Sequence, residues 1–216
     1  MAYSVFVGAG QWVGVVDQAQ GFFGFDPDVG EWQAISDGLP DPLEVRYVAI
    51  RPDQPRTVFA GTQAGPYRSD DGGESWRALP LPADTSEVDS VVWSICLDPN
   101  DPETVYVGTQ GTTVFRSRNG GDDWQRLSIS SPDGALQANF PMRVIRIGVS
   151  SENSDHIIVA FEIGGVVRSR DGGESWESCN KDLLELTAQA HLKSAIVSDK
   201  EIEGMMDSHS LALSPS

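Results

Sequence analysis

The residues of this 216-residue sequence that are best suited to chemistry are arginines and carboxylates at the ends of short apolar runs. A group of guanidinium side chains can bind a carboxylate or a sulfate through paired hydrogen bonds. Glu162 could act as an acid or a base if it were partly desolvated. The candidate residues of a ligand-binding face are Arg46, Trp93, Arg143, Arg146, Glu162 and His209. The catalytic candidates are Glu162, Arg146 and Asp207, and the residues alone assign no catalytic role to any of them.

A second polar group lies in the last 30 residues or so of the sequence. Its members are His191, Asp199, Glu203, Asp207 and His209. Imidazole and carboxylate groups can ligate a divalent metal, but this spacing matches no metal motif. The sequence therefore favours a solvated acidic loop, with no metal and no other cofactor. No glycine-rich phosphate loop precedes a helix, and the cysteines do not have the spacing of zinc ligands.

The elements that must position these residues are revealed by an internal repeat. One eight-residue phrase occurs as SDDGGESW at 69–76, as SRNGGDDW at 117–124 and as SRDGGESW at 169–176. The copies start 48 and 52 residues apart, and a repeat at this period indicates an array of small supersecondary units. Two apolar β-runs joined by turn residues precede each phrase, and a third run enters it. A fourth run begins at the Trp in the first two copies, and four short antiparallel strands per repeat are typical of a β-propeller blade.

The repeated phrase is predicted to be a turn. An Asp or Asn side chain accepts hydrogen bonds from nearby amides, the paired glycines supply positive φ, and the Trp packs onto the strands. The pattern Ser-x-Asp-x-Gly-x-Ser/Thr-Trp resembles the Asp-box (BNR) repeat of sialidase-like and related propellers. The residues that fit this structural box are Ser69, Asp71, Gly73, Trp76, Ser117, Asn119, Gly121, Trp124, Ser169, Asp171, Gly173 and Trp176.

The middle copy departs from the family pattern, because Asn119 replaces the Asp and Asp123 replaces the Ser. In proteins of this family the box is a structural turn on the face away from the active site. The resemblance therefore implies the fold more strongly than it implies an activity.

The predicted architecture is an all-β propeller of four-stranded antiparallel blades that makes up about half a ring. A single domain, 1–216, is divided into predicted blades at 1–36, 45–80, 91–129 and 143–179. The first blade is partial and degenerate and keeps only the Trp32 of an eroded box. Residues 180–208 are expected to be an insertion whose short helix begins at a capping box formed by Asp182 and Glu185. Residues 209–216 are expected to be a stub, the first strand of a further blade.

Propellers close with roughly 4 to 8 blades. Three full blades, a partial blade and a stub are therefore not expected to close alone. The sequence favours either a truncated propeller or a homo-oligomer that completes the ring.

The composition restricts the partners. With 15 Lys and Arg against 32 Asp and Glu, the net charge is −17, which argues against nucleic acid and anionic membranes. No apolar stretch approaches the roughly 20 residues that span a bilayer. The sequence starts without a basic signal region, and Cys96 and Cys179 fall in different repeats, as expected for reduced thiols. A cytoplasmic protein is therefore expected, with a protein, a carbohydrate or an anionic small molecule as partner.

Three functions remain open at this point. The leading hypothesis is a ligand- or protein-binding scaffold without catalysis. The first alternative is a glycoside hydrolase of the sialidase-like (BNR) group, although the Phe/Tyr-Arg-Ile-Pro segment and the Tyr-Glu pair of sialidases are not found. The second alternative is an assembly chaperone that resembles the photosystem II stability and assembly factors. That family usually presents a basic patch, which a net charge of −17 does not favour.

Overall fold

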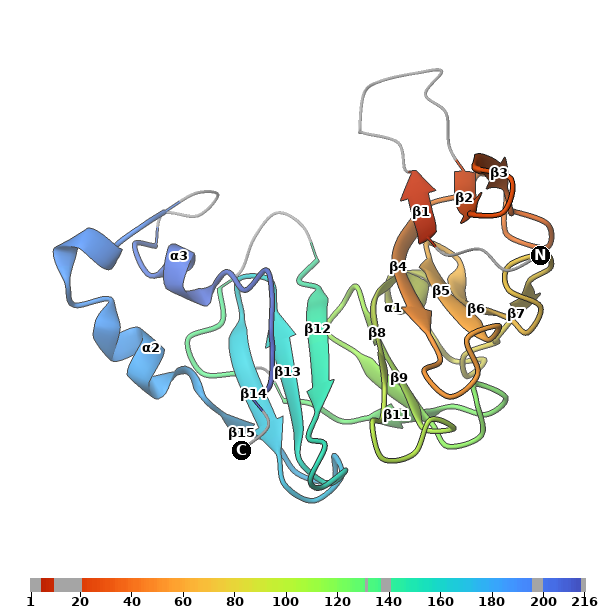
Figure 1. Cartoon of the computed structure of the whole chain (residues 1–216). Helices are drawn as coiled ribbons and strands as arrows, with labels where there is room; N and C mark the ends of the chain where they lie inside the picture. The colour runs from red at the N-terminus through yellow and green to blue at the C-terminus, as the bar shows by residue number, and fades with distance from the viewer. Residues whose placement is uncertain (1–4, 10–20, 131, 137–140, 196–199, 215–216) are drawn as a thin grey trace.

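The computed structural model describes residues 5–9, 21–130, 132–136, 141–195 and 200–214. Within them, strands β1 to β15 form four antiparallel sheets, one after another along the chain, and Figure 1 shows these sheets as successive wedges. In each sheet the hydrogen-bonded neighbours are also neighbours in sequence. The prediction of a partial β-propeller is confirmed, and the four sheets do not close a ring.

We call the sheets blades 1 to 4. Blade 1 has three strands in the described residues, and the other blades have four each. The strands are β1 (Val5–Ala9), β2 (Gly21–Asp26) and β3 (Glu31–Ala34) in blade 1; β4 (Val45–Ile50), β5 (Val58–Thr62), β6 (Gly65–Ser69) and β7 (Arg77–Ala78) in blade 2; β8 (Val92–Leu97), β9 (Val105–Thr109), β10 (Val114–Ser117) and β11 (Gln125–Leu127) in blade 3; β12 (Val144–Val149), β13 (Ile157–Phe161), β14 (Gly165–Ser169) and β15 (Glu177–Ser178) in blade 4.

The first described strand of blade 1, β1, corresponds to the second strand of each of the other blades. Strand β1 lies against β4 of the next blade, just as β5 lies against β8 and β9 lies against β12. Gly8 on β1 also faces Val45, as Gly61 on β5 faces Val92. The described part of blade 1 therefore has the second, third and fourth strands of a blade and no innermost strand.

The core consists of apolar layers between adjacent blades. Burial of these side chains is the main favourable contribution to folding, at about 25 cal/mol per Å² of apolar surface. Each layer takes residues from two consecutive blades: Phe22, Ile35, Val58 and Trp76 between blades 1 and 2; Phe59, Leu79, Val92 and Val107 between blades 2 and 3; Tyr106, Leu127, Val144 and Val159 between blades 3 and 4.

The three box turns are closed by side-chain hydrogen bonds. In the first box, the Ser69 hydroxyl accepts from the Gly73 amide at 2.8 Å and donates to Asp71 at 2.7 Å. Asp71 also accepts from the amide and the hydroxyl of Ser75, at 3.0 and 2.6 Å. The third box repeats these bonds around Asp171. The predicted role of the Asp as the acceptor that organises the turn is what the structure shows.

The middle box keeps the same geometry with donor and acceptor exchanged. The Asn119 side chain accepts from the Asp123 amide at 2.9 Å and donates its Nδ2–H to the Asp123 carboxylate at 3.0 Å. In the other two boxes the side chain at the later position is the donor. The two departures from the family pattern are therefore one compensated change.

The helices lie in the links that follow blades 2 and 4. They are α1 (Glu87–Ser90), α2 (Asn180–Leu186), the 3-10 helix η1 (Ala190–Leu192) and α3 (Glu203–Met206). The predicted capping box is wrong, because α2 starts before Asp182. Its start is set instead by the buried Asn180, whose side chain accepts from the Val166 amide and donates to the Gly164 carbonyl. Within the described ranges, every helix is too short and too polar to cross a membrane.

The predicted strand at 209–216 is not formed over 209–214, and 215–216 lie outside the described residues. A strand requires a ladder with a neighbour, and no described strand pairs with this segment. Leu211 and Leu213 nevertheless lie against Gly148 of β12. The segment thus lies beside the innermost strand of blade 4 without any pairing of its own.

Candidate functional site

The innermost strand of each complete blade carries a β-bulge at the same place. The antiparallel register slips between Val45 and Tyr47, between Val92 and Ser94, and between Val144 and Arg146. The extra residues are Arg46, Trp93 and Ile145. A bulge redirects a side chain away from the regular alternation of a strand. This feature therefore presents Arg46 and Trp93 at the start of their strands.

Trp93 is the centre of the site. The guanidinium carbon of Arg46 lies 4.6 Å from the centroid of the indole, and that of Arg143 lies 4.2 Å from it. Both distances are within the range of a cation–π interaction. The three residues come from blades 2, 3 and 4, so the site spans three successive blades at one end of their innermost strands.

A carboxylate balances each arginine. Arg143 forms an ion pair with Glu162 at 2.9 Å, and Arg46 pairs with Glu44. Burial lowers the pKa of Arg46, opposed by Glu44 and reinforced by Arg143. Glu44 was missed by the sequence reasoning. Its position two residues before Arg46 could have identified it, since oppositely charged side chains so close in sequence can form an ion pair.

Glu162 is a partly buried carboxylate of the cluster, with a side chain that is 16% exposed. Burial raises its pKa, nearby Asp207 raises it further, and Arg143 and His209 oppose the shift. The Asp207 carboxylate is also 3.2 Å from Nε2 of His209, whose side chain is 79% exposed. The link after blade 4 therefore brings a second carboxylate and an imidazole next to Glu162.

Three buried polar atoms of this cluster have no hydrogen-bond partner in the described part of the chain. They are Nη1 of Arg46, Oε2 of Glu162 and Oδ1 of Asp207. A buried polar atom without a partner is costly, by about 1 to 3 kcal/mol. Together they offer one donor and two acceptors to an incoming group. Such a site suits a ligand that donates hydrogen bonds to two carboxylates and accepts one from a guanidinium.

Arg146, another predicted site residue, lies outside the cluster. Arg146 lies with its guanidinium 5.0 Å from the ring of Tyr47 and donates to the Ile145 carbonyl, so it is not part of the cluster around Trp93. Gln110, in the loop after β9, accepts a hydrogen bond from the Trp93 indole at 3.3 Å. The structure thus brings together Arg46, Trp93, Arg143, Glu162, Asp207 and His209 from the predicted set.

Four of the five residues considered as metal ligands, His191, Glu203, Asp207 and His209, lie within the described residues. Asp199, one of the five residues considered, lies outside them. In the ranges that are described, no three His, Cys, Asp or Glu side chains come together as a metal site would require.

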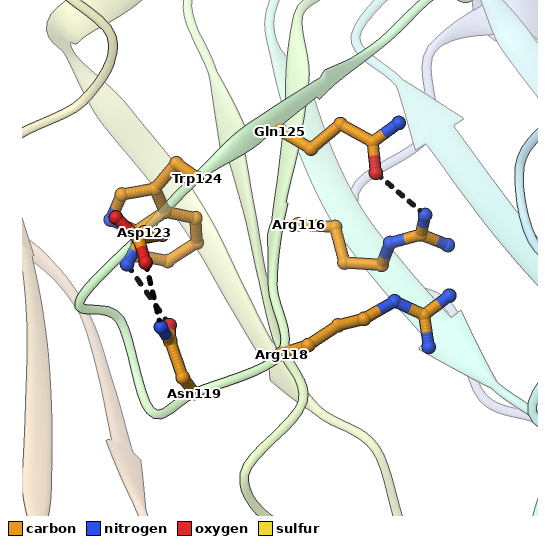
Figure 2. A pocket seen from close by; sticks show the side chains of 6 residues that line it. All are labelled: Arg116, Arg118, Asn119, Asp123, Trp124 and Gln125. Atoms are coloured by element: carbon orange, nitrogen blue, oxygen red, sulfur yellow. Dashed lines mark hydrogen bonds between the residues drawn. The ribbon is translucent and has the colours of Figure 1, made fainter.

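A separate cavity of about 270 Å³ lies at the opposite end of blade 3, around the middle box (Figure 2). Its lining residues are Arg116, Arg118, Asn119, Asp123, Trp124 and Gln125. Arg116, Asn119 and Asp123 are already engaged in bonds that hold the box and the next blade. We assign this cavity to the structural turn, and the group around Trp93 is the candidate functional site.

The fold and the Ser–Asp turns define the class of this protein, which is a BNR/Asp-box repeat β-propeller. A family model described as BNR/Asp-box repeat matches residues 67–78, which run from β6 through the first box to β7. The resemblance inferred from the repeated phrase is therefore confirmed.

One curated relative and two solved structures illustrate the likeness. The chain is 29% identical over 154 residues to the photosystem II assembly lipoprotein Ycf48 of Synechococcus sp. (strain CC9902), a match that covers 70% of this chain and 40% of the relative. It is similar in structure to an ancestral GH74 enzyme, with a TM-score of 0.56, 23% identity and coverage of 73% of this chain and 21% of the enzyme. The GH74 enzyme of Niastella koreensis gives a TM-score of 0.53, 16% identity and coverage of 73% and 26%.

The chain therefore spans less than half the length of the curated relative and about a quarter or less of the two enzymes. The similarity to the enzymes concerns the fold.

Proposed function

We propose that this chain is part of a non-catalytic propeller that binds a protein partner through the cluster around Trp93. The observation that carries the proposal is the set of three buried atoms without partners, on Arg46, Glu162 and Asp207. The relative named as an assembly lipoprotein supports a role in protein assembly over a role in catalysis. In this proposal the propeller holds a partner in place and performs no reaction on it.

The chemistry of the cluster selects the kind of partner. Two carboxylate oxygens, on Glu162 and Asp207, lack donors, so a partner arginine or lysine side chain fits the site. The net charge of −17 attracts a basic segment at long range and raises its association rate. We therefore propose a basic peptide segment of a protein as the ligand class.

The test uses fluorescence polarisation of two labelled hexapeptides that differ only in a central Arg or Glu. We expect the Arg peptide to bind the unmodified chain and the Glu peptide to bind at least about tenfold more weakly, which corresponds to about 1.4 kcal/mol. The variants Glu162→Gln and Asp207→Asn should weaken binding of the Arg peptide. Asp122→Asn, on an exposed carboxylate in the middle box, is the matched control and should leave binding unchanged. Equal binding of both peptides, or an equal loss in the control, contradicts the proposal.

A glycoside hydrolase is the second candidate, and one observation favours it. Glu162 has a raised pKa beside a second carboxylate, Asp207, and glycosidases use such a pair as acid and as nucleophile or base. The ion pair between Glu162 and Arg143 opposes it, because it favours the charged form that cannot donate a proton. Turnover of 4-methylumbelliferyl glycosides of the sialic acid, glucose and xylose series, lost in Glu162→Gln, would establish the enzyme in place of the scaffold.

A further inference from the structure

Two turns bring side chains to the cluster around Trp93. In the turn between β9 and β10, the Gln110 side chain accepts a hydrogen bond from the Trp93 indole at 3.3 Å. In the turn between β13 and β14, the Glu162 carboxylate pairs with Arg143 at 2.9 Å. The conformation of these two turns therefore determines where two polar side chains of the candidate site lie.

Both turns contain a β-branched residue in strained backbone. Thr112, two residues after Gln110, has φ of +68°, and Ile163, directly after Glu162, has φ of +51°. Among the described residues, every other positive φ belongs to a glycine. The left-handed region is unfavourable for a β-branched residue because its Cβ crowds the backbone, and such a conformation persists only where the surrounding structure enforces it. Backbone strain in this protein is therefore concentrated in the two turns that reach the candidate site.

The side chain of Ile163 is buried, and its burial opposes relaxation of the turn. Ile163 is 2% exposed, although it belongs to none of the three apolar layers between the blades. In the corresponding turn of blade 2, by contrast, Ala64 follows Gln63, is exposed and has no positive φ. Rotating the Ile163 backbone out of the left-handed region would move its side chain from this apolar environment, which is unfavourable. The side chain thus acts as an anchor for the strained turn.

Hydrogen bonds from two other segments hold the same turn. The Leu136 amide, in the link before blade 4, donates to the Ile163 carbonyl at 3.1 Å. Nδ2 of the buried Asn180, at the start of α2, donates to the Gly164 carbonyl at 3.0 Å and to the Asp133 carbonyl at 2.7 Å. The turn that carries the Glu162 carboxylate is therefore fixed by the link before its blade and by the helix after it.

We infer that Ile163 is a positioning residue of the candidate site, whose buried side chain keeps the turn in the strained conformation that holds the Glu162 carboxylate against Arg143. The inference rests on the proposed function, because it concerns how the same site is prepared for its partner. A carboxylate that is held in place before the partner arrives loses less conformational entropy on binding than a free one. The cost of ordering one flexible side chain corresponds to a loss of affinity of about three- to tenfold.

The first test measures binding of the labelled hexapeptide with a central Arg. Ile163→Gly removes the anchor and gives the turn many conformations, so we expect the affinity to fall by about three- to tenfold. Ile163→Val keeps a β-branched apolar side chain and should bind like the unmodified chain. Ala64→Gly is the matched control, since it places a glycine in the corresponding turn of blade 2, and it should leave the affinity unchanged. Full affinity in Ile163→Gly, or an equal loss in Ala64→Gly, overturns the inference.

The second test uses the protein without a ligand. Burial is the main cause of the raised pKa of Glu162, and the charged groups that face this carboxyl are Arg143, Asp207 and His209. If the turn relaxes, Glu162 becomes solvated and its pKa should fall towards that of an ordinary Glu. The carboxyl ¹³C signal of Glu162, assigned by its absence in Glu162→Gln, reports this pKa in a titration followed by NMR. We expect a lower pKa in Ile163→Gly than in the unmodified chain and in Ile163→Val, and the same pKa in all three contradicts the inference.

The two tests separate this inference from the proposed function. If the Arg peptide does not bind the unmodified chain, the proposed function fails, and the pKa of Glu162 still shows whether Ile163 holds the turn. Ile163→Ala is the second variant, to be used if Ile163→Gly lacks a cooperative urea transition. Alanine shortens the anchor at a position where positive φ remains unfavourable, so the turn should relax and the pKa of Glu162 should again fall. An unchanged pKa in a folded Ile163→Ala variant rules out the positioning role.

Discussion

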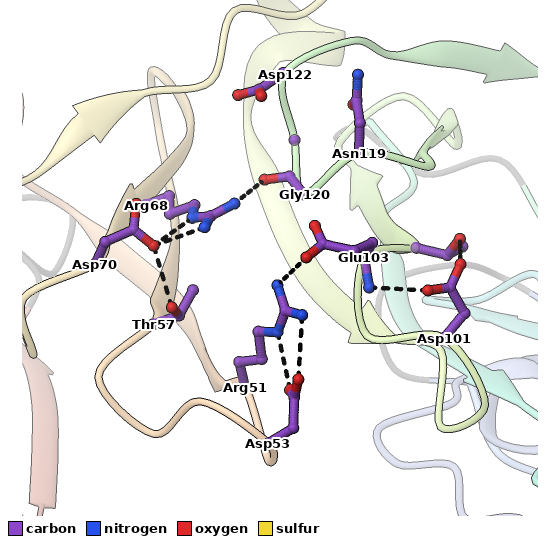
Figure 3. Close-up of polar contacts among 12 residues, drawn as sticks. Arg51, Asp53, Thr57, Arg68, Asp70, Asp101, Glu103, Asn119, Gly120 and Asp122 are labelled. Atoms are coloured by element: carbon purple, nitrogen blue, oxygen red, sulfur yellow. Dashed lines mark hydrogen bonds and ion pairs between the residues drawn. The ribbon is translucent and has the colours of Figure 1, made fainter.

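The guanidinium of Arg68 in blade 2 donates to the carbonyl oxygen of Gly120 in blade 3 at 2.9 Å, across 52 residues of sequence (Figure 3). The same contact recurs one blade later between Arg116 and Gly172, at 2.5 Å. Figure 3 also shows Arg51 of blade 2 paired with Glu103 of blade 3, at 2.6 Å. The box thus stabilises its own turn and also provides the acceptor that ties the preceding blade to it.

Arg68→Ala should lower the free energy of unfolding by about 1 to 2 kcal/mol, since it removes the bond to Gly120 and the cation–π contact of the guanidinium with Phe59. Arg168→Ala is the matched control, because its guanidinium reaches no other blade and it is partly exposed, and it should cost no more than about 0.5 kcal/mol. Urea denaturation of both variants measures the two losses. Equal losses would mean that the bond between blades does not stabilise the fold.

The middle box allows a test of whether the changes at Asn119 and Asp123 compensate for each other. Asn119→Asp should destabilise the chain by about 1 kcal/mol, because it places a second carboxylate against that of Asp123. Adding Asp123→Ser restores the donor and acceptor pattern of the first box, where the Ser75 hydroxyl donates to Asp71. The double variant should therefore be more stable than Asn119→Asp alone. A double-mutant cycle by urea denaturation measures the coupling, and additive effects would contradict the exchange of donor and acceptor.

The repeated phrase was sufficient to predict the blades and the box turns, because its glycines and its Asp or Asn have few structural alternatives. The sequence also identified Arg46 and Trp93 as candidates for the ligand-binding face. It did not reveal that both sit on a bulge, since a bulge is defined by pairing with the next strand and leaves no local signature. The stacking of Arg46 and Arg143 on Trp93 depends on three blades at once, so no pattern within one repeat could indicate it.

The expectations for the chain after the third box were less accurate, because tertiary contacts determine the secondary structure of that part. Asn180 rather than Asp182 determines where α2 begins, through bonds to the Val166 amide and the Gly164 carbonyl that lie far from it in sequence. The 209–214 segment has an apolar pattern typical of a strand, but pattern alone cannot supply the neighbour that a strand requires.

Gly121→Ala should destabilise the chain more than a substitution at any open glycine. Gly121 has φ of +99°, and a Cβ at this position would lie 2.5 Å from Cδ1 of Leu79 in the preceding blade. The backbone strain and the overlap together should cost about 3 kcal/mol. Gly30→Ala is the matched control, with φ of +77° and no atom within 4 Å of the added Cβ, and it should cost about 1 kcal/mol. Thermal unfolding of both variants provides the comparison. Equal losses of stability would show that Gly121 and Leu79 are not in tight contact.

Acid should weaken the box turns between about pH 4 and pH 2. Hydrogen bonds from the Ser175 hydroxyl and amide, and from Ser169, lower the pKa of Asp171 from 3.8 to about 2. The pKa of Asp71 is also about 2, because bonds from Ser75 and Ser69 outweigh the partial burial that would raise it. For a carboxylate whose folded pKa is lowered, the stabilisation is complete above the unfolded pKa and is lost as the pH falls through the folded value. The contribution of both residues should therefore be full above about pH 4 and should disappear towards pH 2.

The variant that isolates this effect is Asp171→Asn. It should be less stable than the unmodified chain at pH 6, and the difference should shrink between pH 4 and pH 2 as Asp171 itself becomes protonated. Asp182→Asn, on an exposed residue of α2, is the control and should show no such convergence. Urea midpoints at pH 6, 4, 3 and 2 measure both differences. A stability difference for Asp171→Asn that stays constant over this range would mean that the charge of the carboxylate does not contribute to the turn, and that its shape alone is sufficient.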